Sequence, residues 1–191
     1  MIFISARNFG VNLTKEQIMY ASGKLWQAIG DNAPFYPDSL RFLKSLIVNH
    51  KSFYLITSSD CRLGYSSKDK LFTYDPQYSK NLKLERLKKF TELGIPKENI
   101  FIGDPHDKPE TQIFKNAMKK ASVDLGIELT SDVKDKTHPM CTTVMIGDSI
   151  TNDLLPAKKA GIEKLIWINR GKSKGIKIPR GINIFEKLIA V

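Results

Sequence analysis

Two aspartates near the C-terminal end of the chain, Asp148 and Asp153, have the chemistry and the spacing of a metal site. Asp148 follows a largely apolar run at residues 143–146 and a single glycine, Gly147. A continuous apolar run predicts a buried parallel strand, and an open α/β sheet binds its ligands at the carboxyl ends of such strands. Two carboxylates there suit Mg²⁺, which takes one or two protein carboxylates and fills its other positions with water and phosphate oxygens. For Asp153, an ordinary acid in the first turn of a helix is the alternative.

Polar residues follow two other predicted strands in the same way. Thr57 and Ser58 follow the apolar run 53–56, and Lys108 lies between the apolar run 100–102 and a predicted helix. The Thr57 hydroxyl and the backbone N–H of Ser58 could hydrogen-bond an anion, and the Lys108 ammonium could neutralise a phosphate. Because parallel strands end at one edge of a sheet, we expect these residues and Asp148 to share a rim. Taken singly, each is explained as well by a turn residue or an exposed lysine.

Alternating strands and helices must position these side chains. Apolar runs alternate with segments whose apolar residues recur at helical spacing. The predicted strands are 53–56, 100–102, 143–146 and 165–168, and the predicted helices are 37–47, 83–93, 112–126 and 153–160. This order predicts an α/β fold with a doubly wound parallel sheet.

The N-terminal part is less regular than the rest, so we divide the chain into residues 1–33 and 34–191. Residues 2–4 could form a short strand, and Thr14 and Gln17 stand at capping-box spacing at the start of a helix. Residues 62–80 show no clear period and are expected to form a surface loop near the site or a small hairpin.

The charge of the chain is strongly basic. The 191 residues suffice for one well-buried domain with a small addition, and their net charge is +10, from 30 basic and 20 acidic residues. Such a charge could serve a nucleic acid or an anionic substrate. The basic residues are spread along the chain, however, and the densest run, Arg170 to Arg180, contains no aromatic residue for base stacking. We therefore expect solvated surfaces and no nucleic-acid partner.

The remaining composition favours a cytoplasmic protein. The two cysteines, Cys61 and Cys141, are far apart and form no C-x-x-C pair, so neither a disulfide framework nor a metal knuckle is indicated. No apolar run is long enough to span a bilayer, and no signal-peptide pattern opens the chain.

Taken in order, the strand-end residues resemble the motifs of the haloacid dehalogenase (HAD) superfamily of phosphohydrolases. Residues 147–153, Gly-Asp-Ser-x-x-Asn-Asp, are similar to the fourth motif, whose acids help to hold Mg²⁺. Residues 54–58 resemble the second motif, where Thr57 would hydrogen-bond the phosphoryl group, and Lys108-Pro109 resembles the third, whose lysine steadies that group. The resemblance implies a Rossmann-like core, with residues 1–33 as the remnant of a helical cap. In this family the cap sets the substrate.

The first motif of that family is missing. Its members begin with an apolar strand and Asp-x-Asp, in which the first Asp attacks phosphorus and the second acts as general acid and base. No Asp-x-Asp occurs in this chain. Either the chain is an N-terminally truncated fragment, or Ser5 and Arg7 occupy the acid positions of a degenerate first motif. We favour the fragment, because Thr57, Lys108 and Asp148 are all retained.

The resemblance therefore implies a Mg²⁺-dependent phosphatase of a small phosphorylated molecule. In it, Asp148 and Asp153 would hold the metal, and Thr57, Ser58 and Lys108 would bind the phosphoryl group. The alternative is a catalytically inactive module that binds phosphate or another ligand, because the chain lacks its nucleophile.

Overall fold

The computed structural model describes residues 8–31, 34–59, 63–66, 68, 71–74, 76–126, 143–171 and 178–188. The predicted strand 2–4, Ser5, Arg7 and both cysteines lie outside these ranges. The described residues form two compact units. The first contains the chain up to Phe35 and the stretch Ser59–Lys89, and the second contains Tyr36–Ser58 and the chain from Phe90 onward. The predicted division between residues 33 and 34 stays a prediction.

The first unit combines helices with a small hairpin. Helix α2, Lys15–Asp31, opens with the expected capping box: the Thr14 N–H donates to Gln17 Oε1 at 2.8 Å, and the Gln17 N–H donates to Thr14 Oγ1 at 3.3 Å. Strands β2, Leu63–Ser66, and β3, Leu71–Tyr74, pair antiparallel. Of the two structures expected for residues 62–80, the hairpin is therefore present.

The helix predicted at 83–93 has different bounds. Helix α4 spans Pro76–Arg86, and a short helix α5 spans Lys88–Glu92, with a turn at Leu87 between them. The sequence pattern predicted a single helix, because Leu84, Leu87 and Phe90 keep helical spacing across the turn. Lys83 was expected on a solvated face, but only 7% of it is exposed.

The second unit contains two parallel sheets. Strand β1, Leu55–Ser58, pairs with β4, Ile100–Gly103. Strand β5, Val144–Gly147, pairs with β6, Lys164–Ile168, which also pairs with β7, Ile182–Phe185. These five parallel strands and the helices between them confirm the α/β fold class. The four predicted strands are all present, and β7 is one that the sequence reading missed.

The two sheets do not join through the described strands. β1 has β4 as its single partner there, and β5 has β6. Each therefore has one edge whose backbone N–H and C=O groups are paired with no described strand. Val144, at the start of β5, is 43% exposed, although its run of sequence is that of an interior strand.

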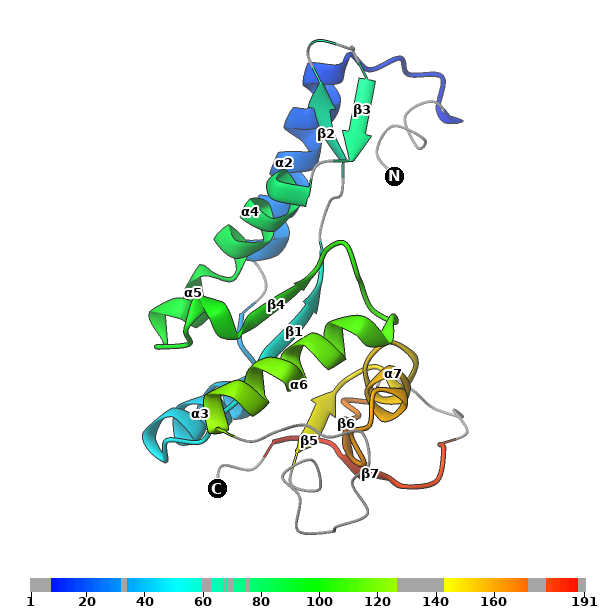
Figure 1. Ribbon diagram of the computed structural model, residues 1–191. Helices are drawn as coiled ribbons and strands as arrows, with labels where there is room; N and C mark the ends of the chain where they lie inside the picture. Colours follow the sequence, from blue (N-terminus) through cyan, green and yellow to red (C-terminus); the bar gives the residue numbers. More distant parts are fainter. Residues whose placement is uncertain are drawn as a thin grey trace. The chain divides into compact units, whose positions relative to one another are not determined.

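Helix α6, Thr111–Leu125, supplies much of the core of this unit. It contacts strands β1 and β4, lies beside β1 in Figure 1, and ends at Gly126, which adopts the left-handed conformation with φ +65°. Its inward residues pack with those of the C-terminal sheet in one apolar cluster: Ile113, Phe114, Met118, Ile150, Leu154, Ala157, Ile162, Leu165 and Trp167. Because Ile56 and Phe101 pack against the same cluster, the core supports both sheets.

Two further helices flank the strands. Helix α3, Pro37–Val48, begins with a proline at its first position, as predicted. The helix expected at 153–160 begins earlier, with a π-helical turn at Ile150–Leu154 that leads into α7, Leu155–Lys159. Within the described ranges, no helix has the length and apolar character needed to cross a membrane.

Candidate active site

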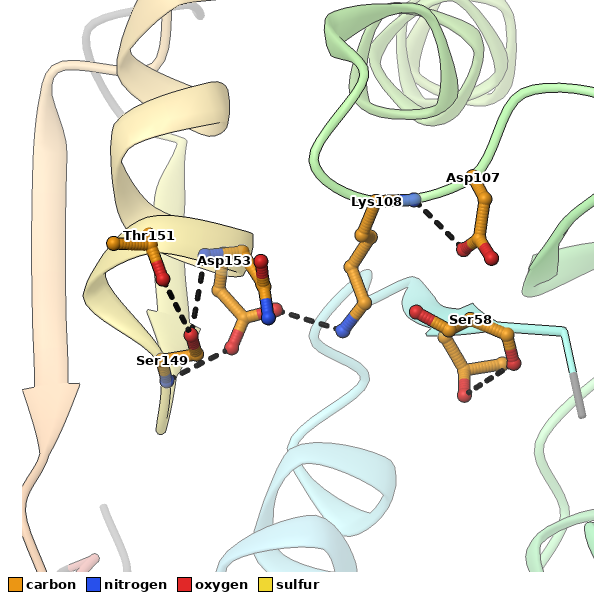
Figure 2. Close-up of polar contacts among 8 residues, drawn as sticks. Ser58, Asp107, Lys108, Ser149, Thr151 and Asp153 are labelled. Atoms are coloured by element: carbon orange, nitrogen blue, oxygen red, sulfur yellow. Dashed lines mark hydrogen bonds and ion pairs between the residues drawn. The ribbon is translucent and has the colours of Figure 1, made fainter. Parts of the chain in front are cut away.

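An ion pair joins the residues that were expected at two different strand ends. Lys108 Nζ lies 2.7 Å from Asp153 Oδ1, and the side chains are 16% and 5% exposed, respectively. In Figure 2 the Lys108 side chain extends from its loop to Asp153, and Ser58 lies on the other side of the ammonium group in this view. Because the pair is largely shielded from water, the lysine is held in one place and its charge is weakly screened.

The loop after β5 fixes Asp153 from the other side. Its Oδ2 accepts a hydrogen bond of 3.0 Å from the Ser149 N–H, and Ser149 Oγ accepts one of 3.1 Å from the Asn152 N–H. Ser149 thus caps the helical turn that carries Asp153. Gly147 is required next to it, since a Cβ there would lie 2.6 Å from Asp153 Cβ.

The Lys108 loop has the same construction. Asp107 Oδ1 accepts a hydrogen bond of 2.7 Å from the Lys108 N–H. The Asp107 side chain lies against Gly103, where a Cβ would come within 2.1 Å of Oδ1. In both loops, a glycine that ends a strand makes room for the carboxylate of a later aspartate.

Thr57 and Ser58 end strand β1, beside the last residues of β4. Their partners in the parallel register are Ile102 and Gly103. The Thr57 hydroxyl donates to the Ser58 carbonyl at 3.4 Å, which is near the upper limit for a hydrogen bond. A weakly bonded hydroxyl can turn toward an incoming anion at small cost.

Asp148 follows β5 directly and is exposed. Its backbone carbonyl accepts a hydrogen bond of 3.2 Å from Trp167 Nε1, so a core side chain fixes its position. The residue lines a cavity of about 250 Å³ together with residues that follow β6. No group of three or more His, Cys, Asp and Glu side chains suitable for a metal occurs in the described ranges.

A second buried ion pair lies beside that cavity, and the sequence reading missed it. Arg170 Nη2 donates to Asp38 Oδ2 at 2.8 Å and to Ser39 Oγ at 3.1 Å, and its guanidinium stacks on the Tyr36 ring at 4.0 Å. The Leu188 N–H also donates to Asp38 Oδ2, at 2.8 Å. The hydrogen bond from Arg170 is the main cause that lowers the pKa of Asp38 to about 2. The sequence analysis looked for polar residues after three of the predicted strands. The same search after the strand 165–168 would have identified Arg170 as a candidate site residue.

Comparisons with known proteins agree with this geometry. Residues 105–180 match the sequence model of the HAD-hydrolase-like family. The fold resembles the crystal structure of a HAD phosphatase from Thermococcus onnurineus, with a TM-score of 0.53 and 21% sequence identity. Residues 105–180 are therefore similar to the HAD-hydrolase-like family, and the fold is similar to that of a HAD phosphatase. A search of curated proteins found no match.

The structural match covers a larger share of this chain than of the HAD phosphatase from Thermococcus onnurineus. The structural match covers 94% of this chain but 63% of the Thermococcus protein, so the chain spans less than two thirds of that structure. At this identity the likeness establishes the fold and does not carry the activity across. The family match at 105–180 includes Lys108, Asp148 and Asp153, three of the five predicted site residues.

Within the second unit, the predicted site residues fall into groups. Lys108 and Asp153 are in direct contact, while Thr57 and Ser58 end the strand beside the one that leads to the Lys108 loop. Asp148 faces the cavity, and both carboxylate oxygens of Asp153 already accept hydrogen bonds. The two aspartates, predicted alike as metal ligands, thus have different surroundings.

Proposed function

We propose that this HAD-like chain contributes the phosphate-binding and metal-binding parts of a phosphatase that acts on small phosphorylated molecules. The observation that carries the proposal is the shielded Lys108–Asp153 pair at the carboxyl ends of parallel strands, with Asp148 directly after β5. Phosphoryl transfer depends mainly on positioning and on neutralising the charge of the transferred group. A fixed, partly desolvated ammonium is well suited to that task.

Each residue has a distinct role in this proposal. Lys108, steadied by Asp153, donates to a phosphoryl oxygen and offsets its charge. The Thr57 hydroxyl exchanges its weak bond to Ser58 for one to the phosphoryl group, and the Ser58 N–H donates to another oxygen. Asp107 holds the backbone of the Lys108 loop in place.

The donor set fits Mg²⁺. Asp148 presents an exposed carboxylate at the strand end, and this ion needs only one or two protein carboxylates when water and phosphate supply the rest. Asp148 would be the direct ligand, while Asp153, whose oxygens are engaged, would act mainly on Lys108 and contribute at most one further contact. When bound, the metal would supply charge neutralisation for the phosphoryl oxygens.

The nucleophile in this proposal is an aspartate on a strand outside the described residues. The open edges of β1 and β5 support the idea, because an added parallel strand would pair with both and join the two sheets. Its carboxyl end would then lie beside Thr57 and Asp148. In this form the polypeptide is an N-terminally truncated part of a longer cytoplasmic enzyme.

An assay on the protein extended by its upstream in-frame residues tests the activity. We expect Mg²⁺-dependent phosphate release, and a decrease of roughly 100-fold or more on Lys108→Met or Asp148→Asn. Lys120→Met, on the exposed face of α6, serves as the matched control and should leave the rate unchanged. Full activity of Asp148→Asn would exclude the metal role of that residue. An upstream sequence without an apolar strand and Asp-x-Asp would exclude the fragment.

A non-catalytic binding module is the second candidate. The absence of Asp-x-Asp from the sequence favours it for the 191-residue polypeptide itself. It predicts that phosphate and Mg²⁺ raise the thermal midpoint of this polypeptide without any turnover. Measurable phosphate release by the same polypeptide would exclude it.

A further inference from the structure

Strand β7 forms one edge of the C-terminal sheet. It pairs with β6, and among the described residues no second strand pairs with it. The Asn169 N–H donates to the Phe185 carbonyl at 2.8 Å, so the backbone groups of Phe185 are directed toward β6. Because these groups alternate in direction along a strand, the N–H and C=O groups of Ile182 and Ile184 point away from β6, along the open edge.

The side chains of this edge are largely apolar and exposed. Ile184 is 46% exposed and Phe185 is 44% exposed. Soluble proteins commonly protect an edge strand with a charged residue, a proline or a bulge inside it, and β7 has none of the first two. An open apolar edge of this kind is a template on which another strand can pair.

We propose that β7 pairs antiparallel with β7 of a second copy of this chain, about a two-fold axis at Asn183. In this register Ile182 of each copy lies opposite Ile184 of the other, so their outward N–H and C=O groups satisfy one another. Both copies contribute the same surface, as a closed symmetric dimer requires. The inference does not depend on the proposed function.

Charges at the two ends of the strand favour a second copy in this register. Arg180 precedes β7 and Glu186 follows it, and both are exposed. Pairing about Asn183 brings Arg180 of each copy beside Glu186 of the other, at both ends of the strand pair. A shift of one residue would bring Arg180 beside Lys187, and it would set outward backbone groups opposite inward ones.

The same register covers an exposed aromatic side chain. Phe185 of one copy falls opposite Gly181 of the other, and Gly181 has φ +87° and no side chain. An aromatic ring placed across from a glycine covers the bare backbone at a sheet edge. Pairing with a second copy therefore removes from water apolar surface that one chain leaves exposed.

The association should be weak. Each copy has a net charge of +10, so two copies repel one another until salt screens them, with a Debye length of about 8 Å at 0.15 M. Two short strands also bury less than the roughly 1,200 Å² of the smallest standard interfaces. We expect a dissociation constant on the order of 10 μM.

Analytical ultracentrifugation of the 191-residue polypeptide tests the proposal. In about 0.15 M salt, the mass should approach twice that of the chain as the protein concentration rises to about 100 μM. Arg180→Glu and Glu186→Arg each place like charges at both ends of the strand pair, and each should weaken association at least about 10-fold. An equimolar mixture of the two variants should associate as tightly as the unaltered chain, because every Glu then faces an Arg.

Lys187→Glu is the matched control. It changes the net charge as much as Arg180→Glu does, but in this register Lys187 faces Pro179 and no charged residue. It should not weaken association. A chain that stays monomeric at about 100 μM would overturn the inference. So would a mixture of the two variants that stays monomeric, or association that neither variant weakens, which would place the contact on another surface such as the open edges of β1 and β5.

Amide hydrogen exchange tests the backbone contact directly. The N–H groups of Ile182 and Ile184 should exchange more slowly as the protein concentration rises, because they become hydrogen-bonded in the dimer. The Asn183 N–H, which faces β6, should not change. Exchange at Ile184 that is independent of concentration would exclude β7 as the contact, whatever the oligomeric state.

Discussion

Lys108 and Asp153, 45 residues apart in the chain, meet at 2.7 Å between Nζ and Oδ1. The contact joins the loop after β4 to the helical turn after β5, and so ties the N-terminal sheet of the unit to the C-terminal one. Apart from the apolar cluster, it is a polar link between two sheets that share no strand pairing in the described residues. The pair therefore contributes to the fold as well as to the proposed site.

Removing the lysine should destabilise the protein. In Lys108→Met, the buried Asp153 carboxylate keeps its hydrogen bond from the Ser149 N–H but loses its ammonium partner, and breaking such a pair costs about 3–5 kcal/mol in free energy of unfolding. Urea denaturation measures the loss. The double variant Lys108→Met with Asp153→Leu should recover much of it, because no unpaired charge is then buried.

The control for that prediction is a surface pair of the same chemistry. Lys120 and Asp124 form an i,i+4 pair on α6 with about a third of each side chain exposed. Lys120→Met should cost far less than Lys108→Met, since water and salt screen exposed pairs. Equal losses for the two variants would contradict the shielded character of the Lys108–Asp153 pair.

Gly147 should not tolerate a side chain. In Gly147→Ala the new Cβ would meet Asp153 Cβ at 2.6 Å, so the turn at 150–154 or the strand must move. Overpacking of this kind costs about 1–3 kcal/mol, and it should also displace Asp153 from Lys108. Thermal denaturation measures the loss, with Thr151→Ala on the exposed face of the same turn as control. An unchanged midpoint for Gly147→Ala would show that the turn has room that the structure lacks.

The free energy of unfolding should depend on pH at low pH, because Asp38 has a lower pKa in the folded protein than in the unfolded chain. Its pKa is about 2 in the folded protein, below the ordinary value near 4, because Arg170 and the Leu188 N–H favour the carboxylate. The unfolded state therefore binds the proton more readily, so the contribution of Asp38 is complete above about pH 4 and is lost as the pH falls toward about 2. Denaturation in urea from pH 5 to pH 2 should show this decline, and it should be shallower in Asp38→Asn.

Tyr54 should make the free energy of unfolding depend on pH at high pH, where its contribution is lost as the pH rises. Burial, and then its hydrogen bond of 2.9 Å to Asp124 Oδ2, raise the pKa of this phenol to about 12. The ordinary value is near 10, so the protonated form is favoured by folding. Its contribution is complete below about pH 10 and is lost as the pH rises through about 12. Absorbance titration should detect a late-titrating tyrosine that disappears in Tyr54→Phe; a complete titration near pH 10 would contradict the hydrogen bond.

Local patterns in the sequence determined the element types and the carboxyl-end location of the candidate site. Thr14 and Gln17 predicted the start of α2, and the apolar runs predicted β1, β4, β5 and β6, because capping and burial depend on residues close together in the chain. The same reasoning failed at α4 and α5, where helical spacing continues across the turn at Leu87. It also missed β7, whose run 182–185 ends the sheet beside β6.

Contacts between distant segments could be decided only by the tertiary structure. From the sequence, Asp148 and Asp153 were predicted alike as metal ligands. In the structure, Asp153 forms an ion pair with Lys108, whereas Asp148 lines the cavity. Arg170 was predicted to be a solvated basic residue. In the structure it donates a hydrogen bond to Asp38, which lies 132 residues earlier in the chain. The physical reason is that the partner of a charge, and the water removed around it, are set by packing across the whole unit. Residue type and spacing fix which groups are available, and the fold determines which of them remain available to a ligand.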